Sequence, residues 1–263
     1  MRCLSLFSGI GGLDLGLEQA GIEIVGQSEI DPFACEVLAK HWPTVPNLGD
    51  ITQITEEDLE RLGTVDLVAG GFPCTDTSLA GKRAGLDGDR SGLVYDMARL
   101  VCMVRPRPLW LMENVSGLLA RDMGDLLELV ASCGYSAAWD CIPASALCAP
   151  HRRDRLFVCA WAEGSTPLAH APGERMERSR AARLGISRPS ACKGLPRRGG
   201  TGGCRSHWQT QPELGRLAHG LSSRLARPRL KALGNAVVPQ VGEFVGRHIL
   251  DLAEAVSGPA SLT

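Results

Sequence analysis

Short apolar runs alternate with amphipathic stretches over the first 160 residues of the chain. The apolar runs have the length and composition of buried strands, and they lie at residues 3–7, 22–25, 66–69, 109–112 and 156–160. The stretches between them carry apolar residues on one helical face, and they predict helices at residues 13–20, 32–41, 93–104 and 125–133. This alternation predicts an α/β fold, with a mostly parallel sheet flanked by helices.

The pattern is lost after Glu163, where glycine, proline, serine and arginine dominate up to about Gln211. It returns near the C-terminus, because apolar residues from Val241 onward recur at the spacing of an amphipathic helix. We therefore expect one domain in two parts, residues 1–162 and 214–263. A small, irregular, basic second lobe at residues 163–213 would separate them.

Charge is distributed unevenly, although the net charge of the chain is −1. Residues 151–230 contain 16 basic and 5 acidic residues, so this segment carries +11 and the remainder −12. An arginine-rich block of this kind is typical of a protein that contacts a phosphate backbone. A solvated surface segment is the alternative interpretation.

Composition excludes several other classes of protein. The sequence has neither a basic segment followed by an apolar signal core nor an apolar stretch long enough to span a bilayer, so we expect a cytoplasmic protein without membrane contact. The 10 cysteines are scattered and form no CxxC pair, which disfavours a zinc site or a thioredoxin-like site. We expect no metal and mostly free thiols.

The segment "LFSGIGGLDLGLEQAG" at residues 6–21 predicts a strand, a glycine-rich turn and a helix. Glycines let the backbone approach a ligand, and the first N–H groups of the helix point toward it. The dinucleotide fingerprint GxGxxG is not met, because Asp14 stands in place of the third glycine. The pattern instead suits a nucleoside cofactor that lacks phosphates.

Acidic residues are expected where the next two strands end, namely Glu29 with Asp31, and then Asp50. A carboxylate at the second strand end can accept hydrogen bonds from both ribose hydroxyls, and one at the third can accept a bond from an adenine amino group. Each residue alone is more often a helix cap or a loop charge. Their order and spacing favour adenosine binding.

Three further segments carry candidate chemistry. Cys74 follows a proline in "GGFPCTDTS", where it could be a buried apolar residue, a metal ligand or a nucleophile. Glu113 ends an apolar strand in "MENVSGLL", the position at which open α/β sheets place their functional groups. Arg153 and Arg155 are two residues apart in "APHRRDRLFVCA", so in an extended segment both guanidinium groups would point the same way.

With these residues in place, the chain resembles a DNA (cytosine-5)-methyltransferase of bacterial or phage type. The resemblance covers about residues 1–160 and 214–250. It depends on "FSGIGG", "SEID", "GDIT", "GGFPC", "GKRAGLDGDRSGL", "ENVSGLL", "HRRDR" and "KALGNAVVPQV", in the order typical of the family. The fold it implies is a Rossmann-like S-adenosylmethionine-dependent methyltransferase fold.

The resemblance also implies roles for individual residues. Cys74 would add to carbon 6 of a flipped-out cytosine, and Glu113 would hydrogen-bond ring nitrogen 3 and the exocyclic amine. Arg155, supported by Arg153, would face the carbonyl oxygen, and S-adenosyl-L-methionine would provide the methyl group. The implied cofactor contacts are Phe7, Gly9, Ile10, Gly11, Gly12, Glu29, Ile30, Asp50, Ile51 and Asn235. Residues 75–92 would form a loop that closes over the DNA. The two-part domain, residues 1–162 and 214–263, would be the catalytic and cofactor-binding domain, and its final helix would pack beside the first strand.

Double-stranded DNA is the implied partner. A functional relationship with a cognate restriction endonuclease stays open, and the resemblance implies no stable protein partner, so we expect a monomer. One alternative is a tRNA cytosine-5 methyltransferase of the same fold, and another is a catalytically silent DNA-binding protein. A nicotinamide-dependent oxidoreductase is disfavoured by Asp14. The expected second lobe is short for a target-recognition domain.

Overall fold

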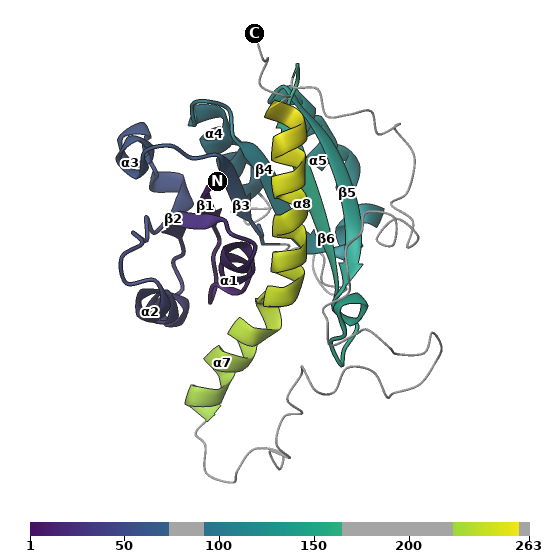
Figure 1. Ribbon diagram of the computed structural model, residues 1–263. Helices are drawn as coiled ribbons and strands as arrows, with labels where there is room; N and C mark the ends of the chain where they lie inside the picture. The colour runs from purple at the N-terminus through teal and green to yellow at the C-terminus, as the bar shows by residue number, and fades with distance from the viewer. Residues whose placement is uncertain (74–91, 165–222, 258–263) are drawn as a thin grey trace.

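The computed structural model describes residues 1–73, 92–164 and 223–257, which form a sheet with helices on both faces (Figure 1). The strands are β1 (Arg2–Leu6), β2 (Glu23–Ser28), β3 (Leu67–Gly70), β4 (Leu109–Val115), β5 (Tyr135–Pro143) and β6 (Asp154–Ala162). The helices are α1 (Gly12–Gln19), α2 (Pro32–His41), α3 (Glu56–Leu62), α4 (Leu93–Met103), α5 (Met123–Ser132), α7 (Ser223–Asn235) and α8 (Pro239–Ser257). Short 3₁₀ helices are η1 (Ile51–Gln53), η3 (Ser116–Ala120) and η4 (Ala144–Leu147). Cys74, nearly all of the expected DNA-closing loop and most of the expected second lobe lie outside the described residues.

The strand order is β2-β1-β3-β4-β6-β5. Strands β1 to β4 are parallel, whereas β6 runs antiparallel to both β4 and β5. The chain passes from β1 outward to β2 and then returns past β1 to β3, so the direction of progress reverses between β1 and β3. Open α/β sheets bind ligands beyond the carboxyl ends of the strands at such a reversal. The predicted fold class is confirmed, and its topology places a candidate site beyond Leu6 and Gly70.

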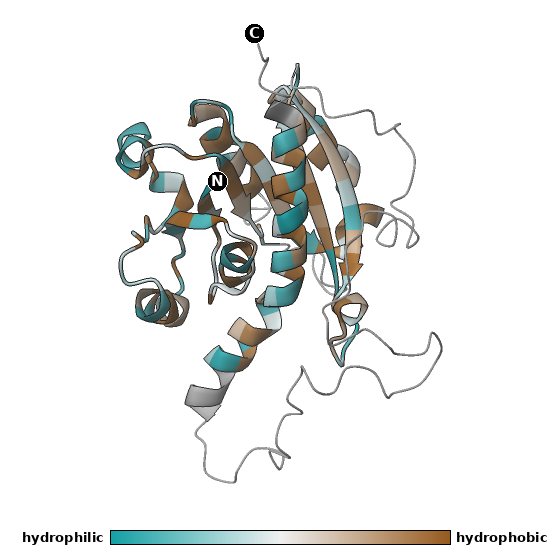
Figure 2. Cartoon of the chain, viewed as in Figure 1, coloured by the Kyte–Doolittle hydropathy of each residue, from teal (hydrophilic) through white to brown (hydrophobic). Residues whose placement is uncertain are grey.

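Successive residues of the central strands contribute to opposite layers of the core, as the pleat of a sheet requires. Leu4, Val68 and Trp110 are buried in the layer that also contains the apolar residues of α3, α4 and α5. Their neighbours Cys3 and Leu67 lie in the other layer, with the apolar residues of α1 and α8. Figure 2 shows apolar residues along the central strands and alternating polar and apolar residues on α8. The central strands are therefore held between two apolar layers.

The final helix, α8, packs chiefly against α1 (Figure 1). The contact is close because glycines face it: a Cβ atom on Gly16 would lie 2.3 Å from the carbonyl oxygen of Pro239 and 2.6 Å from the Cα atom of Gly242. Val241 and Val245 of α8 are buried in the same layer as Cys3 of β1. Helix α8 thus shares a core layer with the first strand, and its most extensive contact is with α1.

The sequence pattern did not predict two of the α-helices and one of the strands. Helix α3 is short, and its polar N-terminus is stabilised by a capping box between Thr55 and Asp58. Strand β5 lies at the edge of the sheet and has little fully buried surface. Helix α7 contains Pro228, a residue that normally ends helices. Within the described ranges, no helix has both the length and the apolar character needed to cross a membrane.

Candidate active site and cofactor edge

The glycine turn after β1 uses each glycine differently. Phe7 and Gly9 both have positive φ angles, 54° and 56°, so the backbone turns sharply at the end of the strand. A Cβ atom on Gly9 would meet nothing within 4 Å, whereas one on Gly11 would lie 2.3 Å from the ring of Trp42, and one on Gly12 would lie 2.3 Å from the carbonyl oxygen of Val237. Gly9 therefore leaves open space at the carboxyl edge, and Gly11 and Gly12 allow close packing behind it.

Glu29 connects the glycine turn to the end of β2. Its Oε2 accepts a hydrogen bond from the Gly9 N–H at 2.8 Å, and its Oε1 accepts bonds from the N–H groups of Ile30 and Asp31, both at 2.8 Å. Asn47 holds the Glu29 backbone, accepting a bond from its N–H at 3.0 Å. The carboxylate is thus placed beside the open space at Gly9, as the sequence predicts, by three backbone donors.

The remaining predicted cofactor residues differ in how available they are. Ile30 is 69 % exposed, which is unusual for a large apolar side chain and leaves a flat apolar surface next to Glu29. Ile10 is half-buried in the turn. Asp50 caps η1 through Thr52 and does not follow a strand, which corrects the prediction. Ile51 is only 4 % exposed, and its carbonyl oxygen accepts a bond from Arg99, so its side chain belongs to the core.

Asp14 forms a buried polar network that the sequence analysis missed. It is fully buried, and it accepts hydrogen bonds from Ser5 Oγ at 2.6 Å and from Gln27 Nε2 at 2.7 Å. Burial raises the pKa of Asp14 to about 6, although both hydrogen bonds oppose this increase. A serine within the buried run of β1 and an acid on the inner face of α1 were the available signals.

The second half of the candidate site centres on Glu113 and Arg155. Strand β4 carries Glu113 and β6 carries Arg155, and the Arg155 Nε atom lies 2.8 Å from Glu113 Oε1. Both side chains are nearly buried, yet neither of these atoms has an aligned hydrogen bond within the part of the chain that the structure describes. Burial raises the pKa of Glu113 to about 7, while Arg155 and Arg153 act in the opposite direction. The pair therefore retains capacity to bond a polar ligand.

The segment that leads into Cys74 is attached to the same strand. Asn114 Nδ2 donates a buried hydrogen bond to the carbonyl oxygen of Phe72 at 3.2 Å. Gly71 lies against Glu113, because a Cβ atom there would be 2.5 Å from Glu113 Oε2. Pro73, the last described residue before Cys74, thus lies two residues beyond the contact of Gly71 with the Glu113 carboxyl group. Sequence reasoning did not single out Asn114 as a positioning residue.

Arg153 and Arg155 do not share one orientation. Arg153 has a φ of 37°, outside the extended region, and it precedes β6. Its Nη2 atom donates hydrogen bonds to the carbonyl oxygens of Gly234 at 2.7 Å and Ala236 at 2.5 Å, at the C-terminus of α7. The expected parallel pair of guanidinium groups is wrong for this reason, although Arg153 remains close enough to affect Glu113 electrostatically. Asn235 is exposed between the two carbonyl groups that Arg153 binds.

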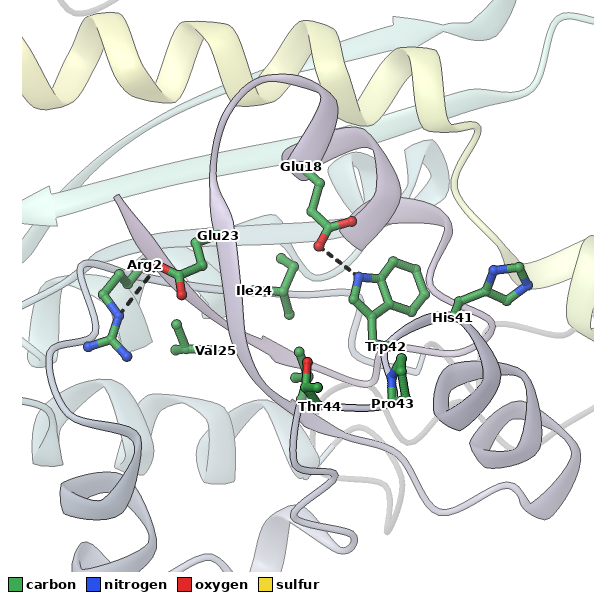
Figure 3. Close-up of a pocket in the computed structure, with 10 residues that line it drawn as sticks. Arg2, Glu18, Glu23, Ile24, Val25, His41, Trp42, Pro43 and Thr44 are labelled. Atoms are coloured by element: carbon green, nitrogen blue, oxygen red, sulfur yellow. Dashed lines mark hydrogen bonds and ion pairs between the residues drawn. The ribbon is translucent and has the colours of Figure 1, made fainter.

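A hollow lies beside Trp42, away from these groups (Figure 3). Arg2 and Glu23, at the amino ends of β1 and β2, line one side of it, and they form an ion pair of 3.7 Å. On the other side, the indole N–H of Trp42 donates to Glu18 Oε1 at 2.8 Å. This bond and the contact with Gly11 make Trp42 a support for α1 and the glycine turn.

The comparisons with known proteins agree with this geometry. The sequence model of the C-5 cytosine-specific DNA methylase family matches residues 1–187, and the chain belongs to that family. It is 41 % identical over 167 residues to the Type II methyltransferase M2.BsuMI of Bacillus subtilis, a match that covers 61 % of this chain and 42 % of the relative. It is 38 % identical over 165 residues to the Type II methyltransferase M.Eco47II of Escherichia coli, a match that covers 60 % of this chain and 38 % of the relative. The chain therefore matches about two fifths of the length of these relatives.

Solved structures support the fold. The crystal structure of a Spodoptera frugiperda DNMT2 mutant has a TM-score of 0.55 and 23 % sequence identity, and the match covers 66 % of this chain and 54 % of that one. The crystal structure of Schizosaccharomyces pombe Dnmt2 methyltransferase has a TM-score of 0.52 and 22 % identity, covering 63 % and 51 %. At these identities the likeness shows the fold alone.

Proposed function

We propose that the protein transfers a methyl group from S-adenosyl-L-methionine to carbon 5 of a flipped-out cytosine in double-stranded DNA, through a covalent adduct with Cys74. The observation that carries the proposal is the nearly buried Glu113–Arg155 pair, directly beside the segment that leads into Cys74. Membership of the cytosine-5 methylase family supports the reaction class. The proposed catalytic set is Cys74, Glu113 and Arg155. Arg153 supports this set and is itself held by its hydrogen bond to the Gly234 carbonyl of α7.

The described residues at the carboxyl edge fit the proposed cofactor. Glu29 provides a carboxylate beside the open space at Gly9, and such a group can accept hydrogen bonds from ribose hydroxyls. The exposed side chain of Ile30 offers an apolar surface for a purine ring. Asn235 and Asp50 are exposed and are proposed as further polar contacts, whereas Ile51 can contribute only through its backbone. When bound, S-adenosylmethionine supplies an electrophilic methyl group.

The residues of the chain would activate the base. Cytosine is electron-poor at carbon 6, so the Cys74 thiolate forms a bond there and the electron pair of the ring double bond becomes available at carbon 5. Glu113, with a pKa near 7, can donate a proton to ring nitrogen 3 while its other oxygen accepts a bond from the exocyclic amine. Arg155 would face the carbonyl oxygen. After methylation, loss of the carbon 5 proton and departure of the thiolate restore the aromatic ring.

Covalent trapping tests the proposal. A duplex with 5-fluorocytosine at candidate target positions is incubated with the protein and S-adenosylmethionine, and adducts are separated on a denaturing gel. Fluorine cannot leave carbon 5 as a proton does, so the parent protein is expected to accumulate a crosslink. Cys74→Ser should give none. Cys102→Ser is the matched control, because it removes another free, half-buried thiol from α4 and should crosslink like the parent.

Methyl transfer to alternative substrates separates the rival functions. With a labelled methyl donor, we expect label in duplex DNA and none in tRNA. Label in tRNA alone would replace the DNA assignment with the tRNA one. Binding of DNA without label or crosslink would indicate a silent DNA-binding protein. Residues 151–230 carry a charge of +11, and we propose that they include the lobe that contacts DNA. We further propose that the enzyme is a monomer, and that residues 214–263 complete its catalytic domain.

A further inference from the structure

Asp14 is a buried acid for which the proposed chemistry has no direct use. It is fully buried in the first turn of α1, and among the described residues no cation forms an ion pair with it. A buried carboxylate without a counter-ion is costly to keep. Its stabilisation comes from Ser5 of β1 at 2.6 Å and Gln27 of β2 at 2.7 Å, so it connects β1 and β2. These two strands lead into Gly9 and Glu29, which define the cofactor edge.

A chain of hydrogen bonds runs from Asp14 to the glycine turn. Ser8 Oγ lies 2.9 Å from Ser5 Oγ and 3.2 Å from the Ser5 carbonyl oxygen, a second acceptor, and Ser5 Oγ lies 2.6 Å from Asp14. Ser8 belongs to the turn itself: its N–H donates to the carbonyl oxygen of Ser28 at 3.2 Å, and its carbonyl oxygen accepts a bond from the Gly11 N–H at 2.9 Å. The position of Ser8 therefore determines where the adjacent Gly9 presents its N–H to Glu29.

The charge of Asp14 fixes the direction of these bonds. An ionised carboxylate can only accept, so Ser5 must donate its hydroxyl proton to Asp14, and the Ser5 oxygen is then free to accept a bond from Ser8. A neutral Asp14 carries a donor of its own. If that proton lies toward Ser5, the Ser5 hydroxyl must donate to another acceptor, and where that acceptor is Ser8 the bond between the two serines is reversed.

We propose that ionised Asp14 is a positioning residue, which holds Ser8 and the glycine turn so that Gly9 and Glu29 receive the cofactor. The inference rests on the proposed function, and it goes beyond it because Asp14 lies beneath the site and touches neither cofactor nor DNA. Removing the charge is expected to weaken cofactor binding without removing any group that contacts the cofactor.

The surroundings of Asp14 allow a pH test. The titratable groups that act on it are Glu18 on its own helix and Cys3 on β1, and its partner on β2, Gln27, is neutral. The backbone of Val237, just before α8, lies against Gly12, and the backbone of α8 lies against Gly16. Burial raises the pKa of Asp14 to about 6, so only about a tenth of it is ionised at pH 5.

The experiment is calorimetric titration of the full chain with S-adenosylmethionine between pH 5 and pH 8. The parent should bind about tenfold more weakly at pH 5 than at pH 8, with the change centred near pH 6. Asp14→Asn should bind more weakly than the parent at pH 8 and should lack this change. Ser5→Ala should also bind more weakly than the parent at pH 8 and lack this change, because it removes the hydroxyl that connects Asp14 to Ser8. The titration of the ligand itself is common to all variants.

Glu18→Gln is the matched control. It lies on the same helix and can still accept the Trp42 hydrogen bond, and it should retain the pH change, displaced slightly downward because the charge of Glu18 raises the pKa of Asp14. A flat profile in the parent, or the parent's profile in Asp14→Asn, would overturn the positioning role and leave the proposed function intact. An absence of binding by the parent at every pH would refute both.

Discussion

Replacing Gly16 with alanine tests whether the C-terminal helix is part of the same folded unit as the cofactor edge. The added Cβ atom would lie 2.3 Å from the carbonyl oxygen of Pro239 and 2.6 Å from the Cα atom of Gly242. Both of these are backbone atoms, so no side chain can rotate away to make room. Helix α8 must therefore move away from α1 by about 1 Å to restore ordinary van der Waals separation.

The expected cost follows from this packing. Overpacking of a well-packed interior costs about 1–3 kcal/mol. Complete undocking of α8 sets an upper limit, because Val241, Val245 and Ile249 would each lose about 1.5–3 kcal/mol of burial free energy. Alanine gains about 0.5–1 kcal/mol over glycine in a helix. We therefore expect Gly16→Ala to lower the free energy of unfolding by about 1–2 kcal/mol.

Urea unfolding followed by circular dichroism measures this difference. The matched control is Gly124→Ala in α5, where an added Cβ atom meets nothing within 4 Å. The control should be more stable than the parent by about 0.5–1 kcal/mol. Equal stability of the two variants would show that α8 does not pack on α1, and that the C-terminal segment does not complete the catalytic domain.

Three further substitutions have defined outcomes. Glu113 has a folded pKa near 7 against an ordinary 4.5, so its burial should lower the parent's free energy of unfolding by up to about 3 kcal/mol between these pH values, where the unfolded state ionises and the folded state still holds the proton. Glu113→Gln should lose this part of the fall in urea titrations and keep the part due to Asp14, whose pKa is also raised; a fall identical to the parent's would contradict the assignment. Arg153→Lys should lower the free energy of unfolding by about 1 kcal/mol, because an ammonium group cannot reproduce the placement of the guanidinium at both carbonyl groups of the α7 C-terminus. If the midpoint of urea unfolding and the midpoint of cofactor titration both stay at the parent's values, Arg153 does not hold the end of α7. Asn114→Ala should cost about 1–3 kcal/mol and slow 5-fluorocytosine trapping, since the Phe72 carbonyl loses its buried donor; trapping at the parent rate would show that this bond does not position Cys74.

The parts of the fold that the sequence predicts are those with a strong one-sided apolar pattern. Helices α1, α2, α4 and α5 and the strands at the centre of the sheet bury a continuous face, and their bounds agree closely with the prediction. Strand β5 was not predicted, because it pairs with β6 at the edge of the sheet and stays half-exposed along most of its length. Helix α7 was not predicted, because it contains Pro228 and its mostly polar sequence gives no clear apolar periodicity.

The site was predictable to the extent that a residue's role depends on its own strand end. Glu29 follows β2 directly, whereas Glu113 lies two residues before the end of β4, which is longer than predicted because it pairs with β6. The contacts of Arg153 depend on a backbone angle of 37° and on a helix 81 residues away in sequence, and neither is visible in the local pattern. Asp14 appeared only as a departure from the dinucleotide fingerprint. Its burial becomes apparent only when β1, β2 and α1 are brought together.

Both halves of the site depend on one short segment of the C-terminal part, residues 231–237. Lys231 pairs with Asp31 at 3.6 Å, next to Glu29 and Ile30. Three residues later the Gly234 carbonyl accepts the Arg153 hydrogen bond, at the start of the strand that carries Arg155. Val237 then packs against Gly12 of the glycine turn. Because this segment contacts the cofactor edge on one side and the β6 start on the other, a displacement of α8 should disturb methyl-donor binding and base activation together.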